Sequence, residues 1–222
     1  MGLHYNKFTG IGLVANFTTR NFFTPHSRSM ATINLGEKFR ILGEHLQYLG
    51  RGKNVAAIAG TQYEFLDIPN FSNFKKIGEY RQNYFRADLK MQYSSNRKFT
   101  IGIGSRFEWI KYKPSIVSTF EVKGKNDYLT SFLYWGINTL DRPVLPRRGV
   151  RMEGELGIVY NQAPAVKVFV NGQEVNPDSL GIRYNDYHRF SFNFETYAPL
   201  SRRTTLFAQL QAGMNFKYDQ NI

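Results

Sequence analysis

The sequence predicts an all-β protein: a transmembrane antiparallel β-barrel, with about eleven strands present in the chain. Three observations carry this prediction. Apolar and polar residues alternate along most of the chain, the alternating segments are mostly about ten residues or longer, and the polar positions hold charges of both signs. Strands of about nine to eleven residues cross a bilayer, whereas strands of soluble proteins average about five or six.

The alternation is clearest over residues 84–93 and 206–216, where apolar residues take the odd and the even positions, respectively. A period of two places each set on its own face of a strand. The segment 39–49 alternates less well, because Arg40 and Glu44 share a face with Leu42 and Leu46. Residues 2–5 resemble the end of another strand. The remaining predicted strands cover residues 10–21, 27–36, 54–67, 97–112, 128–139, 150–160 and 187–198.

The polar faces of these strands carry a mixture of acids and bases. A soluble sandwich would bury such a face against a second sheet at a large desolvation cost, whereas a water-filled barrel lumen accommodates it. The sequence therefore favours a barrel over a sandwich. The charged positions are Glu64, Arg86, Asp88, Lys90, Arg106, Glu108, Arg151, Glu153, Glu155, Arg189 and Glu195.

The connections fall into two kinds. Those after even-numbered strands are mostly short, whereas three after odd-numbered strands are long and cover residues 68–81, 113–126 and 161–186. Short turns at one rim and long loops at the other are typical of outer-membrane barrels. The first two odd-numbered connections, "NKFTG" and "GEK", are short and depart from this pattern. Within the longest, "VKVFVNGQEV" predicts a small hairpin with Asn171 and Gly172 at its turn.

Composition indicates anionic partners. The formal charge is +12, which suits nucleic acid, lipid headgroups or lipopolysaccharide. The absence of cysteine excludes disulfides and thiol chemistry. No run is apolar enough for a membrane helix, and "MGLHYNKF" has no signal-peptide core. Basic residues gather at the short turns, where they predict a lipid-headgroup rim or, alternatively, are solvated turn residues. The rim residues are Arg51, Lys53, Arg97, Lys98, Arg147, Arg148, Arg202 and Arg203.

The sequence predicts no catalytic, cofactor-binding or metal site. "GIGSR" only resembles a nucleophile elbow and lies within a predicted strand. The four histidines lack metal-ligand spacing. Glu153 and Glu155 share a strand face, which suits paired catalytic carboxylates, but a lumen salt-bridge network with Arg151 is the favoured interpretation.

The stretch "NTLDRPVLPRRGVRMEGEL" resembles a strand–turn–strand element of the bacterial surface antigen superfamily, the barrels of outer-membrane assembly factors and two-partner-secretion transporters. Asp141, Arg142, Pro146 and Gly149 match its motif. The resemblance implies about sixteen strands in all. It also implies a periplasmic turn after the eighth strand, which agrees with the count from the N-terminus. The run "GLHYNKFTGIGLVANFTTRNFF" is similar to barrels that follow a patatin-like phospholipase domain.

The chain departs from the family pattern in lacking a Val-Arg-Gly-Phe-like motif. We therefore expect residues 1–222 to be an outer-membrane barrel domain that is incomplete at both ends. The expected role is to anchor or translocate an attached domain, a patatin-like phospholipase, with no enzymatic activity in this chain. The expected partners are outer-membrane lipids and an attached or partner periplasmic domain, at the bacterial outer membrane.

Two alternatives remain. The first keeps the barrel and makes it an outer-membrane assembly or secretion factor. The second is a soluble basic β protein that binds nucleic acid, which the 16% aromatic content also fits. Against the second, aromatic residues such as Phe107 and Trp109 lie on the apolar face near a strand end, as in the interfacial girdles of membrane proteins. The preferred interpretation therefore includes no nucleic acid.

Overall fold

The computed structural model describes residues 2–6, 10–36, 39–72, 75–96, 98–116, 120–170, 173–175, 185–201 and 203–217. In these ranges the chain forms one sheet of thirteen strands. The described residues include no helix long and apolar enough to span a membrane. The strands are β1 (Gly2–Asn6), β2 (Gly10–Arg20), β3 (Ser27–Leu35), β4 (Phe39–Leu49), β5 (Val55–Ser72), β6 (Lys75–Ser95), β7 (Phe99–Ile116), β8 (Phe120–Asn138), β9 (Gly149–Tyr160), β10 (Ala165–Val170), β11 (Gln173–Val175), β12 (Tyr187–Pro199) and β13 (Thr205–Lys217).

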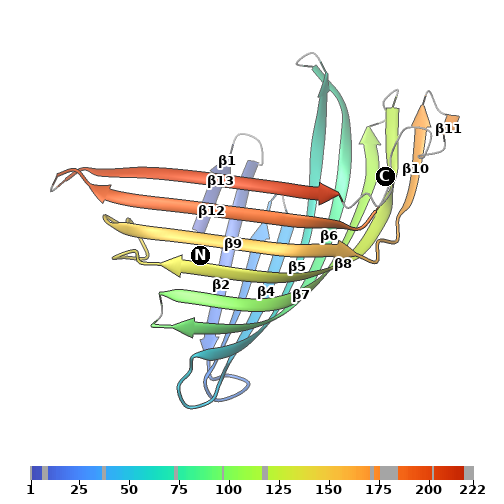
Figure 1. The fold of residues 1–222 in the computed structure, drawn as a ribbon. Coiled ribbons are helices and arrows are strands. Elements are labelled where there is room, and N and C mark those ends of the chain that lie inside the picture. Colours follow the sequence, from blue (N-terminus) through green and yellow to red (C-terminus); the bar gives the residue numbers. More distant parts are fainter. Residues whose placement is uncertain are drawn as a thin grey trace.

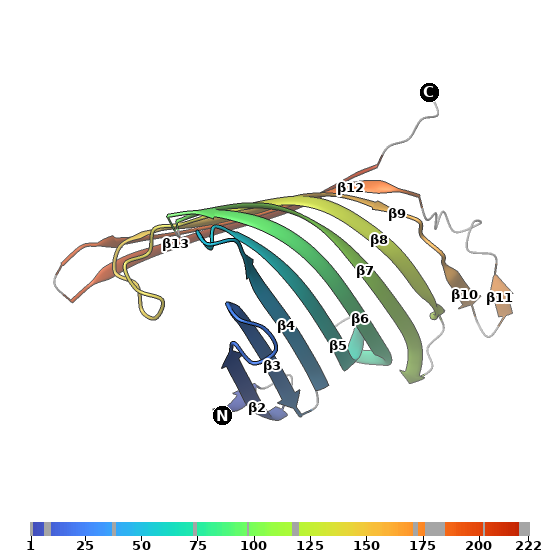
Figure 2. The same ribbon diagram turned by 90° about the horizontal axis from the view of Figure 1, so that it is seen from below.

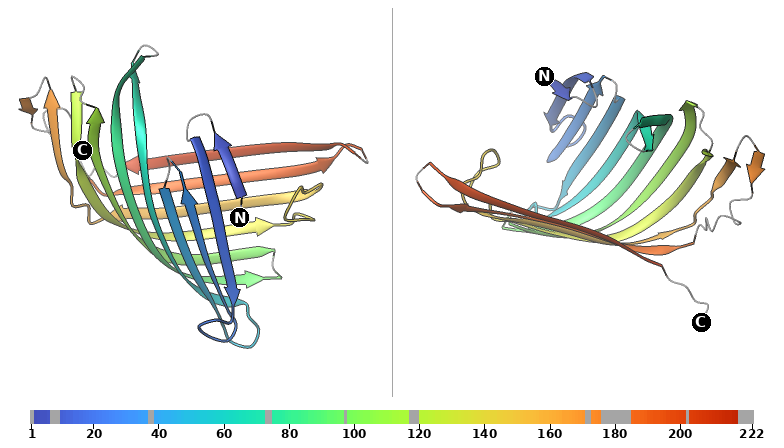
Figure 3. Two further views of the ribbon diagram at one scale, coloured as in Figure 1. Left: turned by 180° about the vertical axis from the view of Figure 1, so that it is seen from behind. Right: turned by 90° about the horizontal axis from the view of Figure 1, so that it is seen from above.

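The main path of the sheet is an antiparallel meander that runs from β1 through β9 to β12 and β13 (Figure 1). Strand direction turns through the sheet, so that β12 and β13 point at a steep angle to β1 and β2, which lie at the opposite end of the path (Figure 3). The strands β1 and β13 stand at the two ends of the path. Among the described residues they do not pair with each other, so the sheet is strongly curved but not closed (Figure 2).

The two faces of the curved sheet have opposite chemistry. Register pairs Asp88 with Arg106 and Arg106 with Thr130, and these buried residues share the concave face. On the convex face, Leu89 and Ile103 are 68% and 62% exposed. Apolar side chains thus point outward and charges point inward, which is the reverse of a soluble protein and the pattern of a transmembrane barrel. Buried polar or charged residues of the concave face are Gln62, Glu64, Asp88, Arg106, Glu108 and Thr130.

The predicted alternation is confirmed in β7 and β13. In β13 the even positions from Leu206 to Phe216 face outward, and the odd positions carry Gln209 and Gln211 on the concave face. The weak alternation of β4 also has a structural cause. Its Leu46 packs on the concave side with Ala56 and Ile58, in the small buried apolar cluster of the sheet.

Two of the three predicted long loops are wrong. Residues 68–81 are mostly the ends of β5 and β6, which pair from Asp67 opposite Arg81 to Ser72 opposite Lys75, beside the hairpin turn. Residues 113–126 are likewise mostly the ends of β7 and β8. Antiparallel pairing continues here because it satisfies the backbone hydrogen bonds, while alternation fades where both faces are polar. Register shifts beside Asn70 and between Glu79 and Tyr80 mark these extensions.

The third connection contains the predicted hairpin. The strands β10 and β11 pair with Val170 opposite Gln173, and the turn residues Asn171 and Gly172 lie outside the described residues. One contact was not predicted from the sequence: β10 also pairs with β8, with Ala165 opposite Lys125 and Val170 opposite Phe120. The hairpin therefore extends the sheet at the end away from the short turns (Figure 1).

Glycines on β7 let aromatic rings fold over the concave face. A Cβ at Gly102 would lie 2.5 Å from the Met91 carbonyl oxygen and 2.6 Å from the Tyr134 ring. The ring of Phe132 covers Gly104 in the same way, at 2.5 Å from the corresponding Cβ position. Such glycine–aromatic pairs permit the sheet to bend tightly while leaving no void on its crowded side.

We predict that Gly102→Ala lowers the free energy of unfolding of the full-length protein by about 1–3 kcal/mol, because the backbone must shift to admit the methyl group. The matched control is Gly213→Ala, where the nearest atom to a new Cβ is 4.0 Å away. Urea midpoints in lipid vesicles measure both variants. Equal midpoints for the two would contradict the packing argument.

Candidate functional site

The centre of the concave face is an ion-pair network that crosses four strands. Arg106 on β7 donates two hydrogen bonds to Glu155 on β9, at 2.9 and 2.8 Å. It passes over β8, where its guanidinium lies 4.4 Å from the centroid of the Phe132 ring. Arg189 on β12 lies 3.6 Å from both Glu155 and Glu108. The network therefore ties non-adjacent strands together, which the backbone ladder alone does not do.

The network continues toward β3 in smaller groups. The carboxylate of Asp88, whose side chain is 1% exposed, lies between Arg86 at 3.0 Å and Lys90 at 2.9 Å. The absence of a side chain at Gly60 makes room for it, because a Cβ there would lie 2.9 Å from Asp88 Oδ2. Charges of both signs alternate across the face, so it compensates its own charge and offers no continuous track for a polyanion. Further contacts join Arg40 with Glu64, Arg28 with Glu44, and the Tyr84 hydroxyl, which donates, with Glu108.

The predicted network of Arg151 with both Glu153 and Glu155 is only half right. Arg151 pairs with Glu153 at 2.8 Å, whereas Glu155 pairs with Arg106 and Arg189. Each carboxylate therefore has its own cationic partner. The described residues contain no cluster of three or more His, Asp or Glu that could hold a metal ion.

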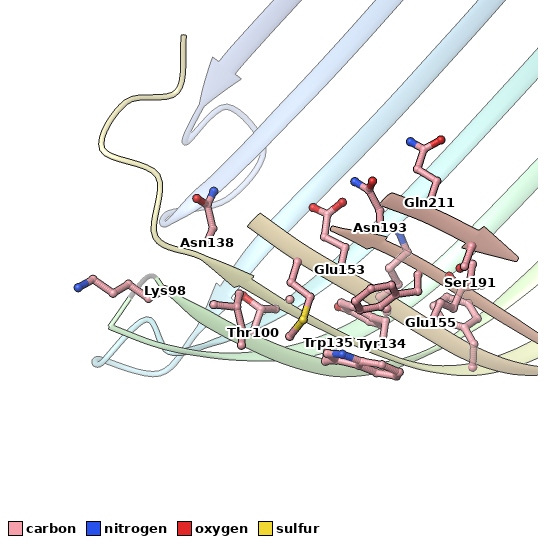
Figure 4. Close-up of a pocket in the computed structure, with 18 residues that line it drawn as sticks. Lys98, Thr100, Tyr134, Trp135, Asn138, Glu153, Glu155, Ser191, Asn193 and Gln211 are labelled. Atoms are coloured by element: carbon pink, nitrogen blue, oxygen red, sulfur yellow. The ribbon is translucent and has the colours of Figure 1, made fainter. Parts of the chain in front are cut away.

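A hollow of about 750 Å³ opens on the concave face, between the ion-pair network and the rim of short turns. Asn138, Glu153, Asn193 and Gln211 project from different strands toward the same side (Figure 4). They present amide donors and acceptors together with one carboxylate. This arrangement can hydrogen-bond a polar or extended chain, but it pairs no nucleophile with a general base. Other polar residues that line it are Lys90, Lys98, Thr100, Tyr134, Glu155 and Ser191.

The turn at residues 139–148 is held by Asp141. Its Oδ1 accepts hydrogen bonds from the backbone N–H groups of Arg147, at 2.9 Å, and Arg148, at 3.3 Å. These bonds from Arg147 and Arg148, together with the nearby Arg142 charge, hold the pKa of the Asp141 carboxyl below its ordinary value. Gly149 has φ +117°, and a Cβ there would collide with the Thr139 carbonyl. Asp141 and Gly149 thus have structural roles at this turn.

The other two motif residues lie at the surface of the same turn. Arg142 Nε lies 3.6 Å from Asp141 Oδ2, and its side chain is 57% exposed. Pro146 is half-buried and follows Leu145, whose φ is +50°. Since proline lacks an N–H, it suits this irregular position and not a ladder.

The predicted rim residues lie on successive turns along one edge of the sheet. Arg147 donates from Nη2 to the Ser201 carbonyl at 2.9 Å, which joins the β8–β9 turn to the β12–β13 turn. The structure thus strings the basic residues along the rim and does not gather them into one pocket. Arg51, Lys53, Lys98, Arg148 and Arg203 are exposed there, and Arg97 and Arg202 lie outside the described residues.

Sequence reasoning identified the charged positions but not their partners or the hollow. Arg106 and Glu155 are 49 positions apart and lie on strands that are not neighbours. Asn138, Asn193 and Gln211 carry no motif. Their only signal in the sequence is that they occupy polar positions of the alternating strands, Asn138 at the end of β8 and Asn193 and Gln211 in the middle of β12 and β13.

We predict that Glu155→Gln lowers the free energy of unfolding by about 3 kcal/mol, because it leaves the buried Arg106 guanidinium without its bidentate partner. The control is Glu174→Gln, which removes a pair with Lys167 on an exposed hairpin and should change stability by less than about 1 kcal/mol. Urea titration of both variants in lipid vesicles measures the difference. A loss no larger than that of the control would contradict the role of the network.

We also predict a pH-dependent effect of Asp141→Asn. The folded pKa of Asp141 lies below its ordinary value of 3.8, so its stabilisation is fully present above that value and is lost as pH falls through the lower folded pKa. The difference in stability between wild type and Asp141→Asn should therefore be constant from neutral pH to about pH 5 and shrink below about pH 4. Urea midpoints across this range measure it. A difference that grows on acidification would contradict the assignment.

Comparison with known proteins places the chain in a family. The model of the OMP85 superfamily matches residues 1–220. No curated protein matches the chain. The match covers nearly all of the sequence, and it agrees with the outward apolar face, the inward ion pairs and the antiparallel meander. Membership points to a barrel of the bacterial outer membrane that serves assembly or secretion, and it lends no support to a soluble nucleic-acid-binding role. The chain belongs to the OMP85 superfamily.

Proposed function

We propose that this chain is the membrane barrel that anchors an attached domain at the outer membrane and translocates it, and that this domain is a patatin-like phospholipase. The observation that carries the anchoring role is the inversion of the two faces, with exposed leucine and isoleucine outside and ion pairs inside. The similarity of the N-terminal run to barrels that follow such phospholipases supports the identity of the attached domain.

We further propose that residues 1–222 are part of a larger barrel of about sixteen strands. In lipid, each unsatisfied backbone N–H or C=O costs several kcal/mol, so open sheet edges are not stable there. The strands β1 and β13 end the order of the sheet and do not pair with each other among the described residues. Pairing of these two edges with further strands, or with a partner, would satisfy them.

In the proposed orientation the short turns face the periplasm and the β10–β11 hairpin faces the cell exterior. The basic short turns support this arrangement, because exposed arginine and lysine side chains favour the anionic headgroups of the inner leaflet. In that orientation the hollow lined by Asn138, Asn193 and Gln211 lies on the concave face between the ion-pair network and the periplasmic rim. This placement favours a second candidate function, in which the barrel receives polypeptide clients as an assembly or secretion factor.

A serine-directed fluorophosphonate probe tests the attached enzyme. We expect it to label the full-length protein in outer membranes and to block release of fatty acids from phospholipid vesicles. An unlabelled full-length protein would contradict the phospholipase. Depletion of the protein separates the roles, because an assembly factor would lower the amounts of many unrelated barrels, whereas an anchor would affect only its own domain.

Single-cysteine labelling tests the orientation, since the natural chain has no cysteine. We predict that Gln173→Cys, on the exposed β11 strand, reacts with a membrane-impermeant maleimide in intact cells. Arg51→Cys, on a short turn at the other rim, should react only after the outer membrane is permeabilised. The opposite pattern would reverse the proposed orientation. The extent of labelling is read by gel shift.

A further inference from the structure

We propose that five lysines on the convex face bind the phosphorylated headgroup of an outer-leaflet glycolipid. They are Lys111, Lys113, Lys123, Lys125 and Lys167. The site goes beyond the proposed function, because anchoring, translocation and assembly are all possible without it. It relies on the proposed orientation, in which the long hairpins face the cell exterior.

The lysines lie side by side on three neighbouring strands. Lys111 on β7 is directly opposite Lys125 on β8, and Lys123 on β8 is directly opposite Lys167 on β10. All five side chains are exposed. Like charges directly opposite each other destabilise a strand pair, so two such pairs in one place favour a bound anion. The pairing of β10 with β8 completes this cluster, because it brings Lys167 beside Lys123.

A hollow of about 560 Å³ is lined by these lysines together with Tyr112, Gly124 and Glu174. Glu174 pairs with Lys167 at 3.0 Å. Within the described part of the chain, the other four lysines form no ion pair. Two acids of β8 occupy positions on the same face: Asp127, opposite Trp109, and Glu121, opposite Phe169. Next to Lys113, Arg81 of β6 adds a further cation, which is paired with Asp67 at 2.9 Å. The lysines still outnumber the acids, so the hollow keeps an excess of positive charge.

The position of the cluster along the strands, next to the apolar belt, indicates a ligand in the lipid headgroup layer. On β7 the convex positions from Ile101 to Phe107 are exposed and apolar apart from Ser105, and Trp109 follows them. Lys111 and Lys113 take the next two convex positions. Tryptophan is enriched at the membrane–water interface, and lysine side chains extend to the headgroup layer. The cluster therefore lies at the level of lipid phosphates.

A phosphorylated lipid fits better than a soluble polyanion. The lysines share the convex face with Leu89, Ile103 and Leu133, which face the acyl chains. An anion that binds these lysines therefore lies directly beside an exposed apolar surface. A lipid meets both requirements at once, with phosphates on the lysines and chains on the belt.

The test compares two variants of equal charge loss in the full-length protein. The first is Lys111→Gln/Lys123→Gln/Lys125→Gln, and the control on the concave face is Arg20→Gln/Arg28→Gln/Arg151→Gln. Bisphosphorylated lipid A is titrated against each protein in detergent, and bound lipid is counted by native mass spectrometry. We expect the first variant to bind on the order of a hundredfold more weakly and the control to stay within about threefold of wild type.

A further variant and two further ligands test whether the site recognises a lipid phosphate. Lys111→Arg/Lys123→Arg/Lys125→Arg should keep binding, and lipid A without phosphates should bind all proteins equally weakly. Displacement of the lipid by inorganic phosphate alone would identify a soluble-anion site and overturn the lipid assignment. Equal loss in both Gln variants, or none in the first, would overturn the site. Heat-modifiable gel mobility confirms folding, and cysteine labelling at Gln173 reports the orientation separately.

Discussion

The alternation of outward apolar and inward charged side chains is the constraint on which the rest of this structure depends. A bilayer cannot hydrogen-bond the backbone, so spanning strands must satisfy their N–H and C=O groups in a ladder, and their polar side chains must face the enclosed side. The pair of Arg106 with Glu155, at 2.8 and 2.9 Å, shows how the charges are then compensated. Because it crosses over β8, the pair also couples strands that share no backbone hydrogen bond.

The curvature of the sheet follows from the crowding of side chains on its concave face. Large side chains such as Tyr134 and Phe132 face inward, where space is scarce, and glycines on β7 accept them. Beyond the apolar belt the β5–β6 ladder continues to Ser72 opposite Lys75, whereas the β7–β8 ladder ends at Tyr112 opposite Gly124 and the end of β8 pairs with β10. The backbone there gains the same hydrogen bonds with water on both faces, so side-chain alternation is no longer required.

The two rims carry positive charge in different ways. At the short turns, basic residues lie on connections that are shaped by backbone contacts, such as the bonds from Arg147 and Arg148 to Asp141. At the other rim, lysines stand on strands and face outward above Trp109. The first arrangement follows an edge, whereas the second forms a compact patch. Membership of the OMP85 superfamily is consistent with a barrel held between two charged boundaries of this kind.

The sequence by itself determined the fold class, the count of strands along the main path, the two faces of each strand and the hairpin around Asn171. These properties are local, because a period of two and a turn dipeptide are readable in a short window. Only the tertiary structure decided the partner of Glu155, the extent of β5 to β8 and the docking of β10 on β8. These depend on register between segments far apart in the chain. Where both faces of a strand pair meet water, apolar and polar side chains need not alternate, so no sequence pattern shows that the strands continue.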